Sequence, residues 1–375
     1  MNTDINRQLK MLFSYGKGRK FYSFANSDGK RWIMPASNMR TAMNLYQPSG
    51  IKGKLVKALL PFLSWNKIVL RLIRAEQINL ALSGELSNLL EKLFCTNNLE
   101  FAVFCGTPCV HQKITMQISR GKKILGYAKF TSSEDIMQVF CHEKEVLDLL
   151  HRQDITDVPE CLFCDKLPCG LWVFVQTTEK TSSSKVPHKW ESQHKAFLDD
   201  IYEKTCKKVE YTDTDFCKDI EYLISNSGCI DEPERLAVTA IAEKIDGYFR
   251  KKGRVEFGVC HMDFTPWNMF EENGKLFVFD WEYARLTYPA GIDVWHFFVQ
   301  TSRFEHHLDA ENIWNRYLII RNRISNVDAY APADLSFKCY LLSIISLYLR
   351  RENGMMTESL RNDISVWLSL TRKLI

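Results

Sequence analysis

The 375-residue sequence has no apolar run that approaches the roughly 20 residues needed for a membrane-spanning helix. Its first ten residues, MNTDINRQLK, are polar and show no secretory signal pattern. Internal repeats and low-complexity segments are absent as well. We therefore expect a cytoplasmic globular protein, and the content of 46% hydrophobic and 25% charged residues is ordinary for that class.

The sequence also lacks paired cysteine motifs at the spacing of a structural zinc site. Its twelve cysteines are scattered from Cys95 to Cys339, and the densest group, CLFCDKLPC, begins at Cys161. That group has no second half that would complete four ligands. In a reducing cytoplasm, free thiols are the simpler interpretation.

Acidic residues are scarce in the first quarter of the chain. Residues 1–95 carry 15 Lys and Arg against 5 Asp and Glu, a balance of +10, whereas the remainder has a balance of −6 and the whole chain +4. A basic front section and an acidic rear section suggest two units, with an anionic partner for the first. No nucleic-acid-binding module is recognisable, so we expect no nucleic-acid partner.

The basic front section contains an apolar stretch, KLVKALLPFLSWNKIVLRLIR, at residues 54–74. Pro61 favours two short helices over one, because proline interrupts helical hydrogen bonding. Basic residues beside Leu, Phe and Trp are compatible with peripheral contact of residues 51–74 with a membrane or an anionic partner. The interpretation that we favour is that these helices pack on the neighbouring domain. Upstream, Asp28-Gly29 separates two predicted short strands.

Residues 97–182 are rich in predicted strands, and the chain after Ser182 is mainly helical. Strands are predicted at 99–104, 112–119, 123–130 and 171–176, with one helix after Ser132 or Ser133, either of which can cap it. Further helices are predicted at 189–207, 214–227, 233–252 and across 290–375.

This order predicts an α+β protein with a two-lobed, protein-kinase-like fold. The N-lobe is a small antiparallel sheet, and the C-lobe is large and helical. We expect three parts: an N-terminal basic accessory segment at 1–96, an N-lobe at 97–178, and a helical C-lobe at 179–375.

The segment NMFEENGKLFVFDWE predicts a β-hairpin, because Asn-Gly between two apolar runs is a strong two-residue turn signal. With the turn at Asn273-Gly274, counting outwards pairs Asn268 with Phe279, and Asp280 follows. Residues paired across strands lie about 5 Å apart. Asn268 and Asp280 should therefore emerge together, and two oxygen ligands so placed suit Mg²⁺.

Just before this hairpin stands HMDFTPWN, with the spacing H-x-D-x-x-x-x-N. It resembles the catalytic loop of phosphoryl-transfer enzymes, in which the Asp receives the proton of the attacking hydroxyl or orients that hydroxyl, and the Asn holds a metal. The alternative is that Asp263 is a turn residue that caps a local N–H. We expect His261 to brace the backbone. A hydrolytic metal site built from His261, Asp263 and Asp280 would need more ligands than this segment offers.

Lys129, in the predicted strand GYAKF, is placed like the kinase strand lysine that binds the α- and β-phosphates. A buried lysine needs a countercharge, and the following helix offers Glu143 and Glu145. We favour Glu143 as the partner. The alternative for Lys129 is a solvated lysine at a sheet edge.

The remaining nucleotide contacts are predicted from two short segments. The loop CGTPC would cover the phosphates, although Gly106 is its single glycine and the pattern G-x-G-x-x-G is absent. Gln176 to Thr178 would form the hinge that meets the adenine through backbone groups.

Together, HMDFTPWNMF, LFVFDWEYAR and GIDVWHF resemble the aminoglycoside phosphotransferase and choline kinase family over about residues 97–375. The resemblance implies that Asp263 is the catalytic base, that Asn268 and Asp280 bind Mg²⁺, and that Lys129 binds ATP. It implies a supporting role for Asp293 within the lobe.

One position departs from the family pattern, since Met262 stands where the family commonly has glycine. The family phosphorylates hydroxyl groups of small compounds such as aminoglycosides, choline, sugars and amino alcohols. Candidate acids for a cationic substrate are Asp199, Asp200, Glu282 and Glu305, although Glu282 is expected to lie beyond the end of its strand.

We therefore expect an ATP- and Mg²⁺-dependent kinase that transfers the γ-phosphoryl group to a hydroxyl of a small substrate. The alternative is a nucleotide-binding scaffold, or pseudokinase, that acts through its N-terminal segment.

Overall fold

The computed structural model describes residues 3–48, 50–64, 66–109, 112–324 and 332–375. The chain divides into two compact units. Unit 1 comprises Met1–Asp148 and Val158–Ser184, and unit 2 comprises Leu149–Asp157 and Lys185–Ile375. The boundary expected after residue 96 falls inside unit 1, whereas the boundary expected after residue 178 lies close to the end of unit 1.

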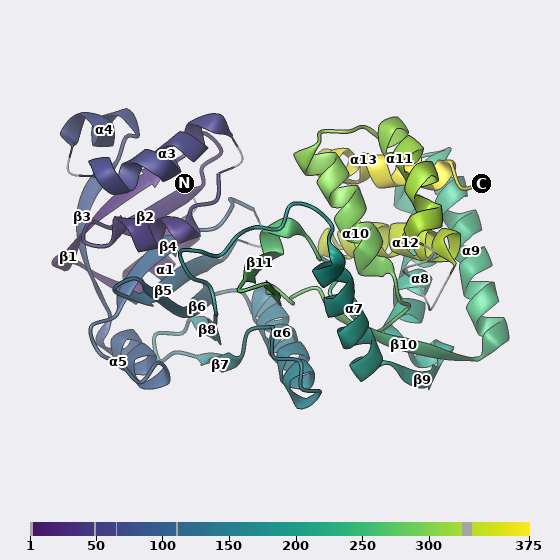
Figure 1. The fold of residues 1–375 in the computed structure, drawn as a ribbon, viewed down its shortest axis with the longest axis horizontal. Coiled ribbons are helices and arrows are strands. Elements are labelled where there is room, and N and C mark those ends of the chain that lie inside the picture. The colour runs from purple at the N-terminus through teal and green to yellow at the C-terminus, as the bar shows by residue number, and fades with distance from the viewer. Residues whose placement is uncertain (1–2, 49, 65, 110–111, 325–331) are drawn as a thin grey trace. The chain divides into compact units, whose positions relative to one another are not determined.

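Unit 1 is built on an antiparallel sheet of eight strands in the order β3-β1-β2-β4-β5-β6-β8-β7 (Figure 1). Residues 1–96 contribute three of these strands, β1, β2 and β3. They join the rest of the sheet where β2 pairs with β4, through Trp32↔Phe104 and Ile33↔Val103. The front section is thus part of the same sheet as Lys129. The strands are β1 (Phe13–Ala25), β2 (Arg31–Pro35), β3 (Glu76–Leu82), β4 (Glu100–Phe104), β5 (Ile114–Arg120), β6 (Lys123–Thr131), β7 (Cys161–Lys166) and β8 (Trp172–Thr177).

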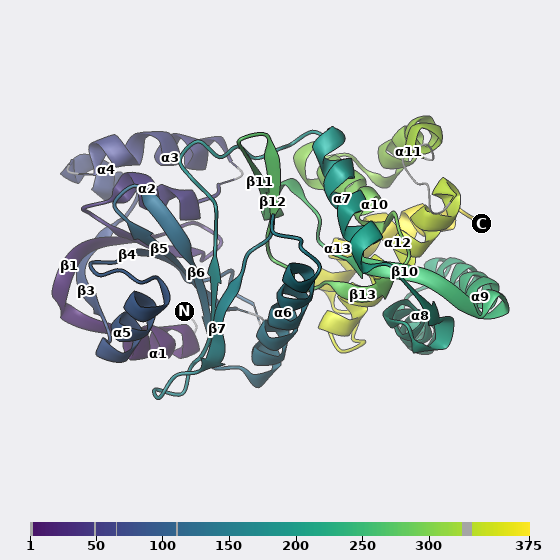
Figure 2. The ribbon, with the colours of Figure 1, turned by 60° about the horizontal axis from the view of Figure 1, so that its bottom comes forward.

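Helices cover both faces of this sheet in unit 1. Successive side chains of a strand point to opposite faces, so Phe21 and Ile33 join one buried cluster while Tyr22 and Trp32 join another. The first cluster includes residues of α1 (Thr3–Leu12) and α5 (Gly84–Leu93). The second includes α2 (Met39–Ala42), η1 (Met43–Leu45), α3 (Ile51–Leu63) and α4 (Lys67–Leu72). Figure 2 shows α1 and α5 on one side and α3 and α4 on the other.

The prediction of two short helices over residues 54–74 is confirmed, but they do not divide at Pro61. Helix α3 continues through Pro61 to Leu63, and α4 starts at Lys67. Pro61 lies in the last turn of α3, where it removes one helical hydrogen bond without ending the helix. The new helix begins because the Asn66 side chain accepts the N–H groups of Ile68 and Val69. Trp65 lies outside the described residues.

Unit 2 is mainly helical. Its core contains Trp295 and Trp367, and each buried indole N–H is satisfied, by Ser336 Oγ at 2.8 Å and Tyr340 OH at 2.7 Å respectively. The helices are α7 (Ser192–Thr205), α8 (Asp215–Asn226), α9 (Glu234–Lys252), α10 (Ile292–Gln300), α11 (Ala310–Ile324), α12 (Ala333–Arg351) and α13 (Glu358–Arg372). The strands are β9 (Lys207–Glu210), β10 (Arg254–Cys260) and β13 (Arg285–Tyr288) in one sheet, and β11 (Met269–Glu272) and β12 (Lys275–Val278) in a hairpin.

The predicted α+β class, with an antiparallel-sheet lobe and a helical lobe, is confirmed by these two units. Helix α6 (Glu134–Arg152) follows β6, as predicted, and begins in unit 1. Of the helical stretch predicted across 290–375, residues 325–331 lie outside the described residues. No helix within the described ranges is both long and apolar enough to cross a membrane.

We predict that Ile33→Ala destabilises all of unit 1. Ile33 is fully buried on β2, between β1 and β4, and truncating such a residue costs about 2–5 kcal/mol. Denaturant unfolding should show this loss, and hydrogen exchange should show lower amide protection in β4, β5 and β6. Ile319→Ala is the control, since Ile319 is exposed and a surface change stays within about 0.5 kcal/mol. Loss of protection confined to residues 3–48 would contradict the single-sheet arrangement.

Candidate functional site

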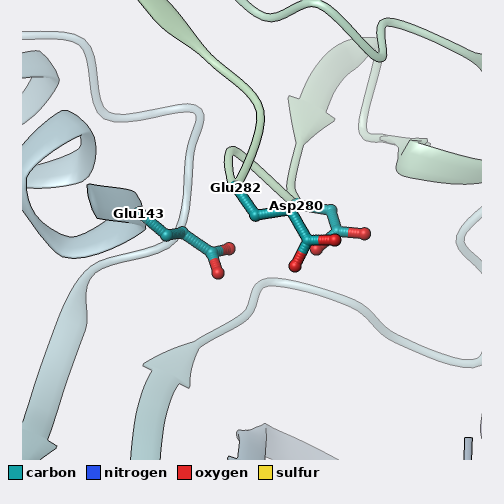
Figure 3. A group of neighbouring side chains, drawn as sticks. All are labelled: Glu143, Asp280 and Glu282. Carbon is teal, nitrogen blue, oxygen red and sulfur yellow. The ribbon is translucent and has the colours of Figure 1, made fainter. Parts of the chain in front are cut away.

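In unit 1, Lys129 forms a buried ion pair with Glu143. Lys129 lies on β6, paired with Thr115 of β5 and Phe174 of β8, and its Nζ lies 2.9 and 2.7 Å from the two carboxylate oxygens of Glu143 on α6. Figure 3 shows the Glu143 side chain extending from its helix. The pairing predicted from sequence is therefore present, and it fixes a buried cation in an interior strand rather than at a solvated edge.

The loop after β4 requires glycine at position 106. Gly106 has a φ of +75°, and a Cβ there would lie 2.4 Å from the Lys113 carbonyl oxygen. The Gln112 side chain donates to the Cys105 carbonyl at 2.7 Å, which closes the loop. The loop therefore owes its tight conformation to one glycine and one glutamine.

Gln176 lies on β8 rather than beyond it. Its register partners are Tyr127 on β6 and Cys161 on β7, and its side chain is buried. Its Oε1 has no hydrogen-bond partner among the described residues. The chain leaves the sheet after Thr177, so the backbone of Thr178 is the first outside the strand.

In unit 2, the β11–β12 hairpin has the register expected from the sequence. Asn273 and Gly274 both have positive φ, 53° and 78°, as a two-residue type I′ turn requires. Glu272 pairs with Lys275. At the open end the Phe279 N–H donates to the Asn268 carbonyl at 3.0 Å. The predicted pairing of Asn268 with Phe279 is confirmed.

The chain turns sharply after this hairpin. Asp280 has a φ of +70°, and the next residue, Trp281, is fully buried and donates its indole N–H to the Val278 carbonyl at 3.1 Å. Carboxylate oxygens of Asp280 and Glu282 lie within 4.8 Å of each other (Figure 3). Glu282 was expected to lie off this face because the strand ends before it, but the chain that turns at Asp280 brings the two carboxylates together. The buried Trp between two acids in D-W-E is the signal that could have indicated it.

The loop that precedes the hairpin is held by Asp293, on the first turn of α10. The two Asp293 carboxylate oxygens accept the backbone N–H groups of His261 at 2.8 Å and Met262 at 2.9 Å. Met262 has a φ of +66°, a conformation that costs a non-glycine residue about 1–3 kcal/mol. Asp293 thus stabilises the left-handed turn at the position where the sequence pattern favours glycine.

His261 braces the same loop. Its Nδ1 accepts the Asp263 N–H at 3.1 Å, so the proton is on Nε2, which donates to the Phe279 carbonyl at 3.1 Å. Burial lowers the pKa of His261 below its ordinary value of 6.5 and keeps the ring neutral. The bracing role expected for His261 therefore matches its hydrogen bonds.

The Asp263 carboxylate is oriented by two side chains. Asn268 Nδ2 donates to one carboxylate oxygen at 2.8 Å and to the Asp263 carbonyl at 3.0 Å. His296 Nε2 lies 3.1 Å from the other carboxylate oxygen. The Asp263 side chain is still 29% exposed. It is therefore fixed in direction but remains accessible to a ligand.

His296 is a residue that the sequence prediction missed. It is 33 positions from Asp263 along the chain, and it stands three residues after Asp293 on α10. Residues three apart share a helix face, so the D-V-W-H spacing was the available signal.

Two tyrosines in unit 2 pack against an arginine. The Arg351 guanidinium lies 5.5 Å from the ring centroids of both Tyr283 and Tyr348. Burial raises the pKa values of both phenols, that of Tyr348 to about 12, so both are neutral.

Three of the acids suggested for a cationic substrate are paired with basic side chains. Glu305 lies 2.7 Å from His188, and Asp200 lies 2.9 Å from Lys204. Asp199 pairs with Lys195.

No protein-family model matches the sequence, and no curated protein matches it. The backbone is similar to several solved structures. A thermostable mutant of aminoglycoside phosphotransferase APH(4)-Ia is 11% identical with a TM-score of 0.49, over 76% of this chain and 98% of that one. ADP-bound aminoglycoside phosphotransferase APH(2'')-Ib is 15% identical with a TM-score of 0.45, over 78% and 99%.

A third structure, a protein named as a fructosamine-3-kinase of Haemophilus somnus 129PT, is 13% identical with a TM-score of 0.47, over 78% of this chain and 97% of that one. Two of the three carry the name of the family that the motifs resemble. At these identities and TM-scores, the activity of this chain has to be argued from its own residues.

We predict that Asp293→Ala loosens the loop without unfolding unit 2. Two backbone N–H groups lose their acceptor, at a cost of about 1–3 kcal/mol. Hydrogen exchange should show faster exchange of the His261 and Met262 amides, and thermal unfolding should show a lower midpoint. Glu243→Ala, on the exposed face of α9, is the control and should leave both unchanged. Unchanged exchange at His261 in Asp293→Ala would contradict the support by Asp293.

Proposed function

We propose that this chain is an ATP- and Mg²⁺-dependent kinase that transfers the γ-phosphoryl group to a hydroxyl of a small substrate. One observation carries the proposal: the Asp263 carboxylate is held by Asn268 and His296 beside a hairpin end that also carries Asp280 and Glu282. A turn aspartate with only a capping role would not need two side chains to orient its carboxylate. The loop fits a residue that orients a hydroxyl.

The donor atoms at the hairpin end fit Mg²⁺. The carboxylates of Asp280 and Glu282 are hard oxygen ligands. Asn268 uses its amide nitrogen twice toward Asp263, which leaves its Oδ1 as the atom for a metal. Asn268 and Asp280 are the proposed ligands, with Glu282 as a third. The ion would supply charge neutralisation at the transferring phosphate.

Asp263 is the proposed catalytic residue. Its carboxylate accepts or orients the proton of the acceptor hydroxyl during in-line transfer. His296 and Asn268 hold the carboxylate so that its free lone pairs face the ligand, which reduces the cost of ordering it in the transition state. Asp293 and His261 have an indirect role, because they fix the backbone that carries the Asp263 side chain.

Lys129 is the proposed ligand of the nucleotide phosphates, with Glu143 holding its ammonium group in place. Lys129 donates charge-assisted hydrogen bonds, which are stronger than neutral ones. The loop at Gly106 and the backbone at Gln176 to Thr178 are the proposed contacts for the phosphates and the adenine.

The proposed acceptor is a hydroxyl of a small compound of the sugar, amino alcohol or aminoglycoside type. Asp199 and Asp200 on α7 are paired with lysines, so neither is assigned to substrate recognition.

We predict that Asp263→Asn lowers turnover by about a hundredfold to ten-thousandfold, since the amide cannot take a proton. The substitution keeps the side-chain shape, so nucleotide affinity should stay the same. ADP release would be measured over a panel of sugars, amino alcohols and aminoglycosides. Asp199→Asn, in the Lys195 pair on α7, is the control and should retain full turnover. Near-normal turnover in Asp263→Asn would exclude Asp263 as the catalytic residue.

We also predict that ATP raises the unfolding temperature only when Mg²⁺ is present. A ligand at about 100 times its dissociation constant adds about 2.7 kcal/mol of stability. Asp280→Ala should lose the Mg²⁺-dependent part of the shift, and Lys129→Ala should lose most of the nucleotide-dependent shift. Removal of the metal with EDTA should reproduce the Asp280→Ala result in the wild-type protein. No shift with any nucleotide would defeat the kinase proposal, and a shift without transfer to any acceptor would favour a nucleotide-binding scaffold.

A further inference from the structure

Helices α3 and α4 in unit 1 expose six large apolar side chains. The exposed fractions on α3 are 80% for Ile51, 55% for Leu55, 50% for Leu59 and 64% for Phe62, and those on α4 are 71% for Ile68 and 77% for Leu72. Spacings of three and four residues place each set on one helix face. The two helices lie next to each other in both views of the fold (Figures 1 and 2). We call these six residues the apolar face.

The opposite sides of the same helices are packed against the rest of unit 1. Leu60 and Val56 of α3 and Val69 and Leu70 of α4 pack into the cluster that contains Trp32 and Tyr46. Packing on the neighbouring part of the protein, the interpretation favoured from the sequence, accounts for this inner side. It does not account for the apolar face, which the fold leaves in water.

Helices α3 and α4 and the residues that join them carry charge of one sign. Residues 51–75 contain six basic residues and no acidic residue. Five of them are exposed, namely Lys52, Lys54, Lys67, Arg71 and Arg74. Within the described part of the chain none of the five forms an ion pair. An occupant of this surface must therefore be apolar where it meets the face and anionic around it.

We propose that α3 and α4 form a peripheral docking surface for anionic lipid bilayers. An amphipathic helix with Leu, Ile and Phe on one side and Lys and Arg beside them lies at the boundary between headgroups and acyl chains. Anionic headgroups attract the basic residues. The attachment is peripheral, since no helix within the described ranges can span a bilayer.

A second copy of the chain is a poorer occupant. Joining two such surfaces would bring their basic residues together, and like charges at an interface oppose association. A lipid surface supplies both the apolar medium and the negative charge. The proposal does not depend on the proposed kinase activity.

The test is sedimentation of the full-length protein with phosphatidylcholine vesicles, with and without phosphatidylglycerol. Wild type should bind the vesicles that contain phosphatidylglycerol, and binding should weaken as salt is added. Leu55→Gln with Leu59→Gln should reduce the bound fraction about tenfold, because binding scales with buried apolar area. Lys52→Glu with Lys67→Glu should abolish the preference for phosphatidylglycerol.

Matched controls distinguish binding through this surface from nonspecific binding to vesicles. Ile319→Gln changes an exposed apolar residue on α11, and Lys251→Glu changes an exposed lysine on α9. Both should bind vesicles as wild type does. All variants should keep the wild-type unfolding temperature within a few degrees, because every substituted side chain is exposed over at least half of its surface or is a surface lysine.

Two results would overturn the proposal. One is no binding of wild type to phosphatidylglycerol vesicles at low salt, and the other is equal binding by wild type and both α3–α4 variants. Light scattering completes the test. A dimer that dissociates in the Leu55 and Leu59 variant, without vesicle binding by wild type, would assign the surface to a second copy of the chain. If the wild-type protein binds vesicles but shows no kinase turnover, the proposed function is wrong and the proposal of a lipid-binding surface is unaffected.

Discussion

The pair of hydrogen bonds from the backbone of His261 and Met262 to the Asp293 carboxylate determines where the loop of unit 2 lies. Those bonds hold Met262 in a left-handed backbone conformation that the residue would otherwise leave. Relaxation would move His261, and with it the contacts to Asp263 and to Phe279 at the hairpin end. The loop and the hairpin are thus positioned by one carboxylate on the first turn of α10. The same helix carries His296, three residues further along, so a single helix supports both the backbone and the side chain of Asp263.

Features that depend on residues close together in the sequence could be predicted from the sequence alone. The Asn273-Gly274 turn predicted the hairpin and its register, because turn type and strand pairing are determined by neighbours in sequence. The pairing of Lys129 with Glu143 was also accessible, since a buried cation needs a countercharge from the nearest helix. The α+β division followed from the change in periodicity near residue 97 and from the helical stretches after residue 182.

Long-range contacts and unusual backbone angles account for what was missed. Nothing local indicates that β2 pairs with β4, and so that residues 1–96 extend the sheet of Lys129. Glu282 comes beside Asp280 only because Asp280 takes a positive φ. His296 reaches Asp263 across a separation that no motif covers. The exposure of α3 was unpredictable for a different reason, because its sequence is apolar on both sides and only the folded chain shows which side is buried.

The hairpin has a consequence for chain length. Asn268 and Asp280 emerge together because the two strands have equal length on either side of the Asn273-Gly274 turn. An insertion of one residue in either strand would shift one of them along the ladder and turn its side chain to the opposite face. Adding one residue to each strand would keep them together. The length of the segment between these two residues can therefore change only in steps of two.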